Sequence, residues 1–171
     1  KNIVEIENEL VKTKVHFTDN NLINPSNPIS VNLIGAGGTG SQVLTALARM
    51  NHALTELNHA GLSVRLWDDD VITEANLGRQ LFAESELGLH KSVALINRIN
   101  RFFGTNWKAD TVKFEKDRFG RLPENAKATT TITCVDNVQT RFNVAEILKE
   151  KVNYGSYRDE PKYWLDFGNS Q

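Results

Sequence analysis

Two hydrophobic periods alternate along this chain. Short runs of apolar and β-branched residues are typical of buried strands, and longer segments with apolar residues three or four positions apart are typical of amphipathic helices. The predicted strands occupy residues 30–34, 62–67, 107–115, 129–135 and 162–167, and the predicted helices occupy residues 40–59, 88–103 and 137 onward. Because strands and helices alternate, we expect an α/β fold with a doubly wound, mostly parallel sheet and helices on both faces.

Each predicted helix has one apolar face, which we expect to pack on the sheet. These faces consist of Val43, Leu47, Met50, Leu54 and Leu57, of Val93, Ile96, Ile99 and Phe103, and of Val138, Phe142, Ala145 and Leu148. Residues 1–29 are expected to be an extended lead-in segment, and residues 116–128 a connection with a short helical turn. Residues 30–171 then form one domain, whose ligands bind beyond the carboxyl ends of the strands.

The composition argues against several classes of partner. The 20 Lys and Arg residues nearly balance 21 Asp and Glu residues, so no overall field attracts nucleic acid or an anionic membrane. No apolar run approaches the ~18 residues of a membrane-spanning helix. The single cysteine, Cys134, allows neither an intrachain disulfide nor a zinc site of paired Cys-x-x-Cys motifs in this sequence. We therefore expect a cytoplasmic protein with no nucleic-acid or membrane partner.

A glycine-rich loop follows the first predicted strand. Gly35, Gly37 and Gly40 satisfy G-x-G-x-x-G between a strand and a helix, and Gly38 enriches it further. Exposed amides and the positive end of the following helix would attract a phosphate. The alternative is a turn that only packs strand against helix. The loop does not distinguish ATP from a dinucleotide, and it lacks the GK[ST] ending of a P-loop.

A cluster of acidic and amide residues follows the second predicted strand. Asp68, at the strand end, is the expected ribose ligand, and Asp70 is a further expected nucleotide-binding residue. Three adjacent carboxylates need hydrogen bonds or cations, and Asp69 alternatively lies in a solvated turn.

A group of polar residues then suggests a triphosphate. On a turn of helix, Asn76 and Arg79 would share a face and meet one ligand together, next to Gln80. Arginine neutralises the oxygens of a leaving pyrophosphate, and Lys91 at the next helix start would add charge, unless it is a solvated surface lysine.

The segments GAGGTGS, DDDVITEANLGRQLF, GLHKSVALINRIN and CVDNVQTR resemble, in order and spacing, the ThiF, MoeB and HesA superfamily of adenylating enzymes related to ubiquitin-activating enzyme. The resemblance spans roughly residues 30–168. More narrowly, the chain resembles the ThiF-family proteins of the PRTRC gene systems of bacterial mobile elements.

The resemblance implies a function for each matching residue. Expected ligands of ATP are Gly35, Gly37, Gly38, Gly40, Asp68, Asp70, Asn76, Arg79, Gln80 and Lys91. The expected Mg²⁺ ligand is Asp136, which alternatively or additionally caps a helix at 137. Arg79, Lys91 and Asp136 are then the expected catalytic residues. The implied reaction joins the C-terminal carboxylate of a small ubiquitin-fold protein to AMP and releases pyrophosphate.

The sequence departs from this family in two respects. It shows neither a thioester-forming cysteine nor a zinc ribbon, since Cys134 is expected to be a buried apolar residue. We therefore expect the domain to be incomplete at its C-terminus, or the reaction to stop at adenylation. A homodimer is expected from the family, but no arginine precedes Arg49 to reach a second subunit's ATP, and Lys12 or Lys14 would have to substitute.

Two other functions remain open from sequence. One is a nucleotide-binding scaffold of a mobile-element system that has lost turnover. The other is a NAD-dependent oxidoreductase, which the Asn76, Arg79, Gln80 and Lys91 cluster disfavours because hydride transfer has no use for it.

Overall fold

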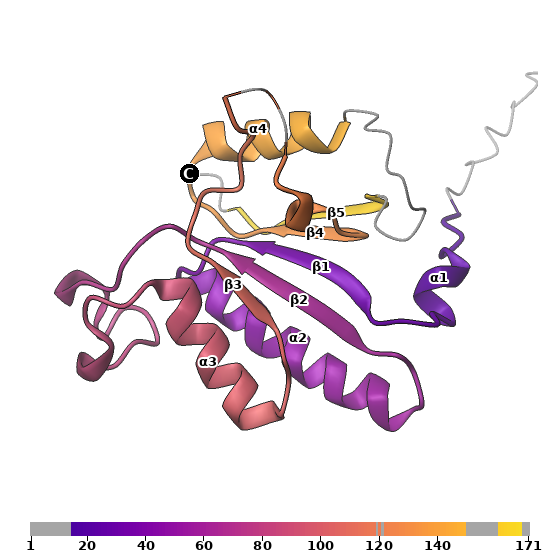
Figure 1. Ribbon diagram of the computed structural model, residues 1–171, viewed down its shortest axis with the longest axis horizontal. Helices are drawn as coiled ribbons and strands as arrows, with labels where there is room; N and C mark the ends of the chain where they lie inside the picture. The colour runs from indigo at the N-terminus through magenta and orange to yellow at the C-terminus, as the bar shows by residue number, and fades with distance from the viewer. Residues whose placement is uncertain (1–14, 119, 121, 150–160, 169–171) are drawn as a thin grey trace, which may run out of the picture.

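A sheet of five parallel strands is the centre of this computed structural model, which describes residues 15–118, 120, 122–149 and 161–168 (Figure 1). The strands are β1 (Ile29–Ile34), β2 (Leu62–Trp67), β3 (Lys108–Asp110), β4 (Thr130–Thr133) and β5 (Tyr163–Asp166). Their order is β3-β2-β1-β4-β5, and every neighbouring pair is parallel. The sheet therefore extends in both directions from β1, and the predicted doubly wound fold is confirmed.

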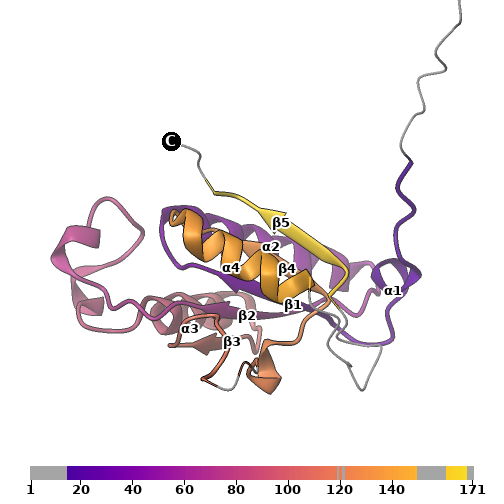
Figure 2. The same ribbon diagram turned by 90° about the horizontal axis from the view of Figure 1, so that it is seen from above.

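Helices cover both faces of this sheet. They are α1 (Asn20–Ile23), α2 (Gly38–Glu56), α3 (Lys91–Phe103) and α4 (Val138–Lys149), with 3₁₀ turns at Glu74–Asn76, Glu84–Glu86 and Glu124–Ala126. Figures 1 and 2 show α2 and α3 on one face and α4 on the other. The segment between β2 and α3 projects beyond the carboxyl ends of the strands, and we name residues 77–90 the projecting loop. Among the described residues, no helix has the length and apolarity needed to cross a bilayer.

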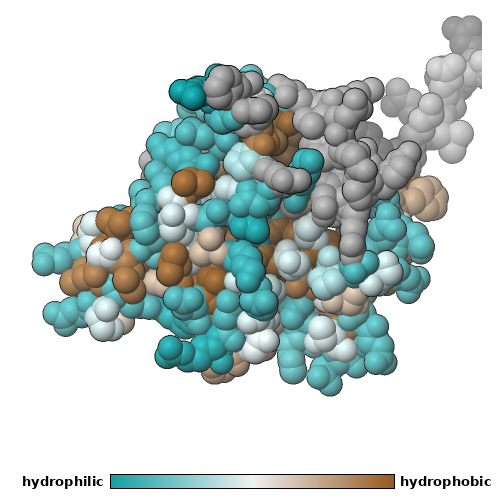
Figure 3. Space-filling model, in the orientation of Figure 1, coloured by the Kyte–Doolittle hydropathy of each residue, from teal (hydrophilic) through white to brown (hydrophobic). Residues whose placement is uncertain are grey.

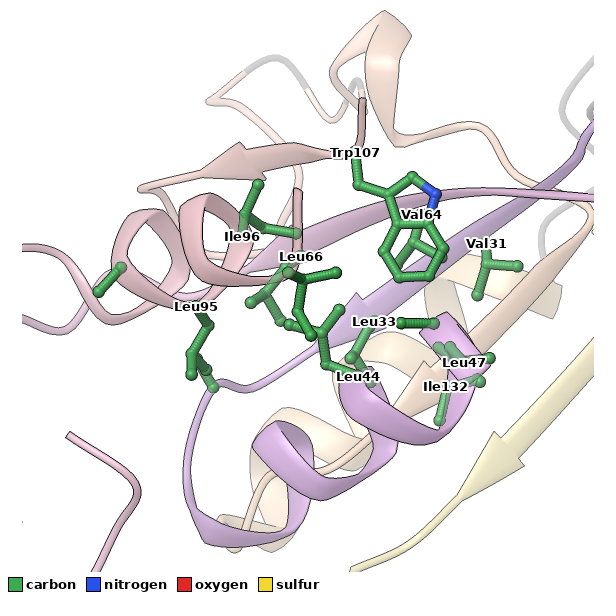
Figure 4. Packing of buried hydrophobic residues seen from close by; sticks show 14 of the residues in the cluster. Val31, Leu33, Leu44, Leu47, Val64, Leu66, Leu95, Ile96, Trp107 and Ile132 are labelled. Atoms are coloured by element: carbon green, nitrogen blue, oxygen red, sulfur yellow. The ribbon is translucent and has the colours of Figure 1, made fainter. Parts of the chain in front are cut away.

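The larger core lies between the sheet and the α2/α3 layer (Figure 4). It contains, among others, Val31, Leu33, Leu44, Leu47, Val64, Leu66, Leu95, Ile96 and Ile132. A second cluster on the α4 side joins Trp67 and Phe114, whose rings meet edge to face at 5.3 Å, to Val144 and Ile147. Each fully buried side chain of this size contributes about 1.5–3 kcal/mol to stability, so packing on both faces stabilises the sheet.

The predicted apolar faces of α2 and α4 are partly wrong, and α2 shows the larger difference. In α2, Met50 is 53% and Leu57 77% exposed, and the buried face passes instead through Leu44, Leu47 and Ala48. The rotation follows from Gly40, which lies directly against the loop after β1 and so turns its own side of α2 toward the sheet.

The hydrophobic pattern predicted the buried face of α3 correctly, but that of α4 only in part. In α4, Val138 and Phe142 are exposed, while Val144, Ala145 and Ile147 are buried. In α3, burial of Ile96 and Ile99 confirms the predicted face.

The third predicted strand is shorter than expected. Pairing with β2 ends at Asp110, so residues 111–115 leave the sheet instead of continuing it. Phe114 folds back into the α4-side core, and Val112 remains 52% exposed. The short helical turn predicted in the following connection is present at Glu124–Ala126. This early departure places residues 112–115 beside the strand ends, where they line a cavity.

The lead-in segment is attached to the far edge of the sheet. Lys162, just before β5, donates from Nζ to Asp19 Oδ2 at 2.5 Å, and the Asp19 amide donates to the Tyr163 hydroxyl at 3.2 Å. These contacts lie at the amino ends of the strands, opposite the projecting loop (Figure 1).

Candidate nucleotide-binding site

A cavity opens at the carboxyl ends of the strands, between the loops that follow β1 and β4. These neighbouring strands continue in opposite directions, so the cavity lies where a doubly wound fold binds its ligands. Its volume is about 620 Å³, within the ~300–1,000 Å³ typical of small-molecule sites. The walls come from the glycine loop, the residues after β2, Gln80, Lys91, residues 112–115 and the β4–α4 junction.

The glycines of the loop divide into two pairs with different reasons to be glycine. A Cβ on Gly40 would lie 1.9 Å from the Gly35 carbonyl oxygen, and Gly35 has a φ of +99°. These two allow the loop to close against α2. A Cβ on Gly37 or Gly38 would meet nothing within 4 Å, and both residues line the cavity. Their bare backbone faces open space at the start of α2, which suits a phosphate group.

The Asp68 carboxylate connects the glycine loop to the end of β2. Its Oδ2 accepts the Ala36 amide at 2.6 Å, and its Oδ1 accepts the Asp70 amide at 3.0 Å. Burial raises the pKa of Asp68 above its ordinary value, although both amides oppose that shift. A carboxylate has about four acceptor positions, so two remain for ligand hydroxyls at the cavity wall.

Lys91 is buried, which contradicts its alternative interpretation as a solvated lysine. Its side chain is 9% exposed, it is the first residue of α3, and its Nζ donates to Asp70 Oδ2 at 2.7 Å. The Asp70 side chain is 64% exposed. Repulsion among the three adjacent carboxylates is thus offset as expected. Asp68 accepts two amides, Asp70 pairs with Lys91, and Asp69 lies 4.0 Å from Lys113.

Asp136, at the β4–α4 junction, lines the cavity and is exposed. The predicted helix cap is wrong in detail: α4 begins at Val138, and Asn137 caps it by accepting the Thr140 amide at 3.0 Å. Asp136 is therefore not required for capping. Among the described residues, no group of three or more His, Cys, Asp or Glu side chains is arranged to hold a metal ion by itself, but Mg²⁺ is commonly held by one or two carboxylates together with phosphates and water. The site fits such an ion.

The Asn76, Arg79 and Gln80 group differs from its predicted arrangement. The 3₁₀ turn ends at Asn76, and Gly78 has a φ of +72°, so Asn76 and Arg79 do not share a helical face. Asn76 is buried, and its Oδ1 accepts the amide and hydroxyl of Thr73 at 2.9 and 3.0 Å. Arg79 is exposed on the projecting loop.

Among the predicted nucleotide ligands, Gly35, Gly37, Gly38, Asp68, Asp70, Gln80 and Lys91 line the cavity, whereas Gly40, Asn76 and Arg79 do not. The predicted Mg²⁺ ligand, Asp136, also lines it. The buried Oε1 of Gln80 accepts no hydrogen bond within the described part of the chain. The fold therefore leaves a buried amide oxygen unpaired in a residue of the cavity wall.

The projecting loop is held to α3 by Arg98. Its guanidinium donates to the Leu81 carbonyl at 2.7 Å and to both carboxylate oxygens of Glu86 at 2.7 and 2.8 Å. Desolvation would raise the pKa of Glu86, but the Ala83 amide and Arg98 hold it below its ordinary value. The segment that carries Arg79 and Gln80 is therefore anchored close to the cavity.

Several cavity residues were missed by sequence reasoning. They are Thr39, Trp67, Val112, Lys113, Phe114, Glu115, Asn137, Thr140 and Asn143. The rule that ligands bind beyond the carboxyl ends of strands would have indicated the segments after the third and fourth strands. The over-long prediction for β3 hid the first of them.

Cys134 also lines the cavity, as a partly buried residue. Burial, with a smaller contribution from Asp166, raises the pKa of its thiol to about 11. A thiol of this kind is protonated at neutral pH, which supports its predicted role as a small apolar residue.

The fold and cavity define the class: a doubly wound α/β protein with a ligand site at its topological switch point. The ThiF family model matches residues 14–154. The chain therefore belongs to the ThiF family, as its motifs indicated.

A relative identified by sequence agrees with this assignment. Ubiquitin-like modifier-activating enzyme 5 of Culex quinquefasciatus is 28% identical over 126 residues, which cover 67% of this chain and 30% of that protein.

Solved structures share the fold. The E. coli tRNA N6-threonylcarbamoyladenosine dehydratase TcdA in complex with AMP matches with a TM-score of 0.58 and 19% identity over 81% of this chain and 50% of that one. E. coli MccB with MccA matches with a TM-score of 0.53 and 22% identity over 81% of this chain and 37% of that one. The chain thus spans half or less of the length of these proteins.

Proposed function

We propose that the cavity binds ATP and that the protein adenylates a carboxylate. The observation that carries this proposal is the combination of bare glycine backbone at Gly37 and Gly38 with a buried ammonium, Lys91, in one cavity. In this arrangement the amides at the start of α2 hold phosphate oxygens, and Asp68 accepts the ribose hydroxyls. The half-exposed Val112 provides apolar surface in the same cavity for the base, backed by the buried rings of Trp67 and Phe114.

Positioning and charge neutralisation are the proposed sources of catalysis. Lys91 holds an ammonium in the cavity, and Arg79 and Gln80 lie on the anchored loop beside it. We infer that Arg79 reaches the leaving phosphates when ATP is bound, since it already neighbours the cavity residue Gln80. Asp136 would hold Mg²⁺, which supplies further charge neutralisation when bound.

The proposed reaction needs no protein nucleophile. A substrate carboxylate oxygen forms a bond to the α-phosphorus of ATP, the bond to the β-phosphate oxygen breaks, and pyrophosphate leaves with the electron pair. Preorganised cations stabilise the charge that develops on the leaving group. The high pKa of Cys134 fits a reaction in which this thiol takes no part.

The proposed substrate is the C-terminal carboxylate of a small ubiquitin-fold protein. The relative from Culex quinquefasciatus, a ubiquitin-like modifier-activating enzyme, supports this class. The fold is also shared with MccB, which was solved with MccA, so a shorter peptide is the second substrate class to test.

The test is ATP–pyrophosphate exchange with Mg²⁺, using the full-length protein and candidate ubiquitin-fold partners with free C-termini. Exchange should depend on the partner's carboxyl terminus and fall at least about hundredfold in Arg79→Ala, the size typical of removing one charged transition-state contact. Arg49→Ala is a control, because Arg49 is exposed on α2 and does not line the cavity.

Other outcomes identify other functions. ATP binding without exchange for any partner would favour a nucleotide-binding scaffold, the alternative consistent with a PRTRC-type mobile-element system. NAD binding in place of ATP would favour an oxidoreductase and contradict the proposal.

We also propose that the protein forms a homodimer. Val71, Leu81, Leu87 and Leu89 are exposed apolar residues on or beside the projecting loop, and Figure 3 shows apolar surface gathered there. Such a patch is typical of a protein-binding surface. Lys12 and Lys14, expected to reach a second subunit, lie outside the described residues. A sedimentation profile showing only monomer at micromolar concentration would contradict the dimer.

A further inference from the structure

We propose that Asp70 is a positioning residue, which orients Lys91 in the cavity and does not itself contact the nucleotide. This inference rests on the proposed function, because it assigns Lys91 to the phosphates of ATP. It also revises the expectation that Asp70 is a nucleotide ligand.

The first reason is that Lys91 requires a counter-charge. Its ammonium is almost fully buried, and it stands at the first residue of α3, where the positive end of the helix dipole disfavours a cation. Burial of an unpaired charge is strongly unfavourable. Within the described residues, Asp70 is the side chain recorded as bonding Nζ.

The second reason is that backbone contacts fix this pair in place. The Lys91 amide donates to the Asp70 carbonyl at 3.0 Å, and the Asp70 amide donates to Asp68 Oδ1 at 3.0 Å. Beside them, Val71 and His90 form an isolated antiparallel bridge. The end of β2 and the start of α3 are therefore joined at the position where the two side chains meet, so the direction of the ammonium is set before any ligand arrives.

The third reason is electrostatic. A carboxylate that bound a triphosphate directly would bring like charges together, whereas a carboxylate paired with Lys91 is already neutralised. An ammonium has three donors. Because Asp70 takes one of them, the other two remain to point at phosphate oxygens.

A double-mutant cycle separates positioning from direct contact. ATP affinity in Mg²⁺ is measured by calorimetry for the full chain, for Asp70→Asn, for Lys91→Met and for the double variant. Asp70→Asn should weaken binding about tenfold, the size of a lost charge-assisted hydrogen bond. In the Lys91→Met background the same change should no longer weaken binding, because the only effect left is the removal of an unpaired negative charge near the phosphates. An equal loss in both backgrounds would overturn the proposal, because Asp70 would then touch the nucleotide or its metal.

A second readout needs no nucleotide. Acetylation of Lys91 by acetic anhydride, followed by peptide mass spectrometry, should be slow in the parent protein and at least about tenfold faster in Asp70→Asn, since the ammonium loses its partner. Asp70→Glu should restore slow labelling and part of the ATP affinity. Unchanged labelling in Asp70→Asn would overturn the proposal even if ATP binds.

The two readouts also separate this inference from the proposed function. If labelling responds as expected but the parent protein binds no ATP, positioning of Lys91 stands and the proposed function fails. The matched control is Asp19→Asn, which removes the carboxylate of a second Lys–Asp pair, with Lys162, at the far edge of the sheet. It should change neither ATP affinity nor labelling of Lys91.

Discussion

The two ends of the parallel sheet use their polar groups differently. At the amino end, Asn51 accepts the Leu62 amide at 2.7 Å, and Asn100 binds both the amide and the carbonyl of Trp107. These side chains close turns, so their hydrogen-bonding groups are already paired within the folded protein. At the carboxyl end, Asp136 is exposed without a capping role, and the Gln80 oxygen accepts nothing within the described residues. Asp136 thus lines the cavity with no part in capping α4, which leaves its carboxylate available to a ligand.

Glycine substitutions should give the largest effects, because they separate residues needed for folding from residues that face the cavity. Gly40→Ala should destabilise the protein by about 3 kcal/mol or more, because the new Cβ would overlap the Gly35 carbonyl. Gly38→Ala should change stability by less than about 1 kcal/mol but weaken ATP binding, since its Cβ would enter the cavity. Urea denaturation and calorimetric ATP titration of both variants give the comparison. Equal destabilisation by the two alanines would mean that the loop has no surface reserved for a ligand.

The reactivity of Cys134 tests whether a cavity residue at the carboxyl end of the sheet is chemically passive. With a thiol pKa of about 11, its thiolate fraction at pH 8 should be about a hundredfold below that of an ordinary cysteine. Alkylation by iodoacetamide should therefore be slow and should continue to accelerate above pH 9, where an unperturbed thiol levels off. The rate is measured against N-acetylcysteine across this pH range. Fast alkylation at pH 7 would contradict the assignment of Cys134 as a passive apolar residue.

One asparagine substitution at each end of the sheet tests whether the polar side chains at the amino end contribute more to stability. Asn100→Ala should cost about 2 kcal/mol, because two backbone groups of Trp107 and the Thr105 hydroxyl lose their partner. ATP affinity should be unchanged. Asn143→Ala, at the cavity, should alter stability by less than about 0.5 kcal/mol, since this exposed residue lies on the surface of α4. Thermal unfolding checks both, and a larger loss in Asn143→Ala would reverse the comparison.

The smallest expected effect is the contribution of Asp166 to stability in acid. Desolvation would raise the pKa of Asp166, but hydrogen bonds from Arg141, Thr133 and the Gly168 amide hold it below its ordinary value of 3.8. The folded state thus prefers the carboxylate. Its stabilising contribution is present above pH 3.8 and is lost as the pH falls through the lower folded pKa.

Asp166→Asn should therefore lower the free energy of unfolding at pH 6 and flatten its decline below pH 4. Urea midpoints between pH 2.5 and 6 measure this difference. A parallel decline in the two proteins would show that Asp166 does not contribute to acid unfolding.

Much of the fold was predictable because local patterns report directly on local structure. Strand and helix alternation identified the doubly wound sheet, and the strand–glycine–helix context predicted the position of the glycine loop that opens α2. The helix faces were less predictable, since α2 and α4 each offer more than one apolar stripe. Packing against the sheet chose Leu44 over Met50 and Val144 over Phe142. A single sequence contains no information about that choice until two elements meet.

The chemical groups of the candidate site and their order could be read from the sequence: bare glycine backbone, a strand-end carboxylate, an Asn-x-x-Arg-Gln segment and a helix-start lysine. The contacts that each group makes followed from the packing of the folded chain. This packing buried Lys91 against Asp70, engaged Asn76 in its own turn, left Arg79 exposed and freed Asp136 by capping α4 with Asn137. The physical reason is that burial and hydrogen-bond partners depend on segments far apart in the chain, which converge only when the parallel strands bring their carboxyl ends to one edge.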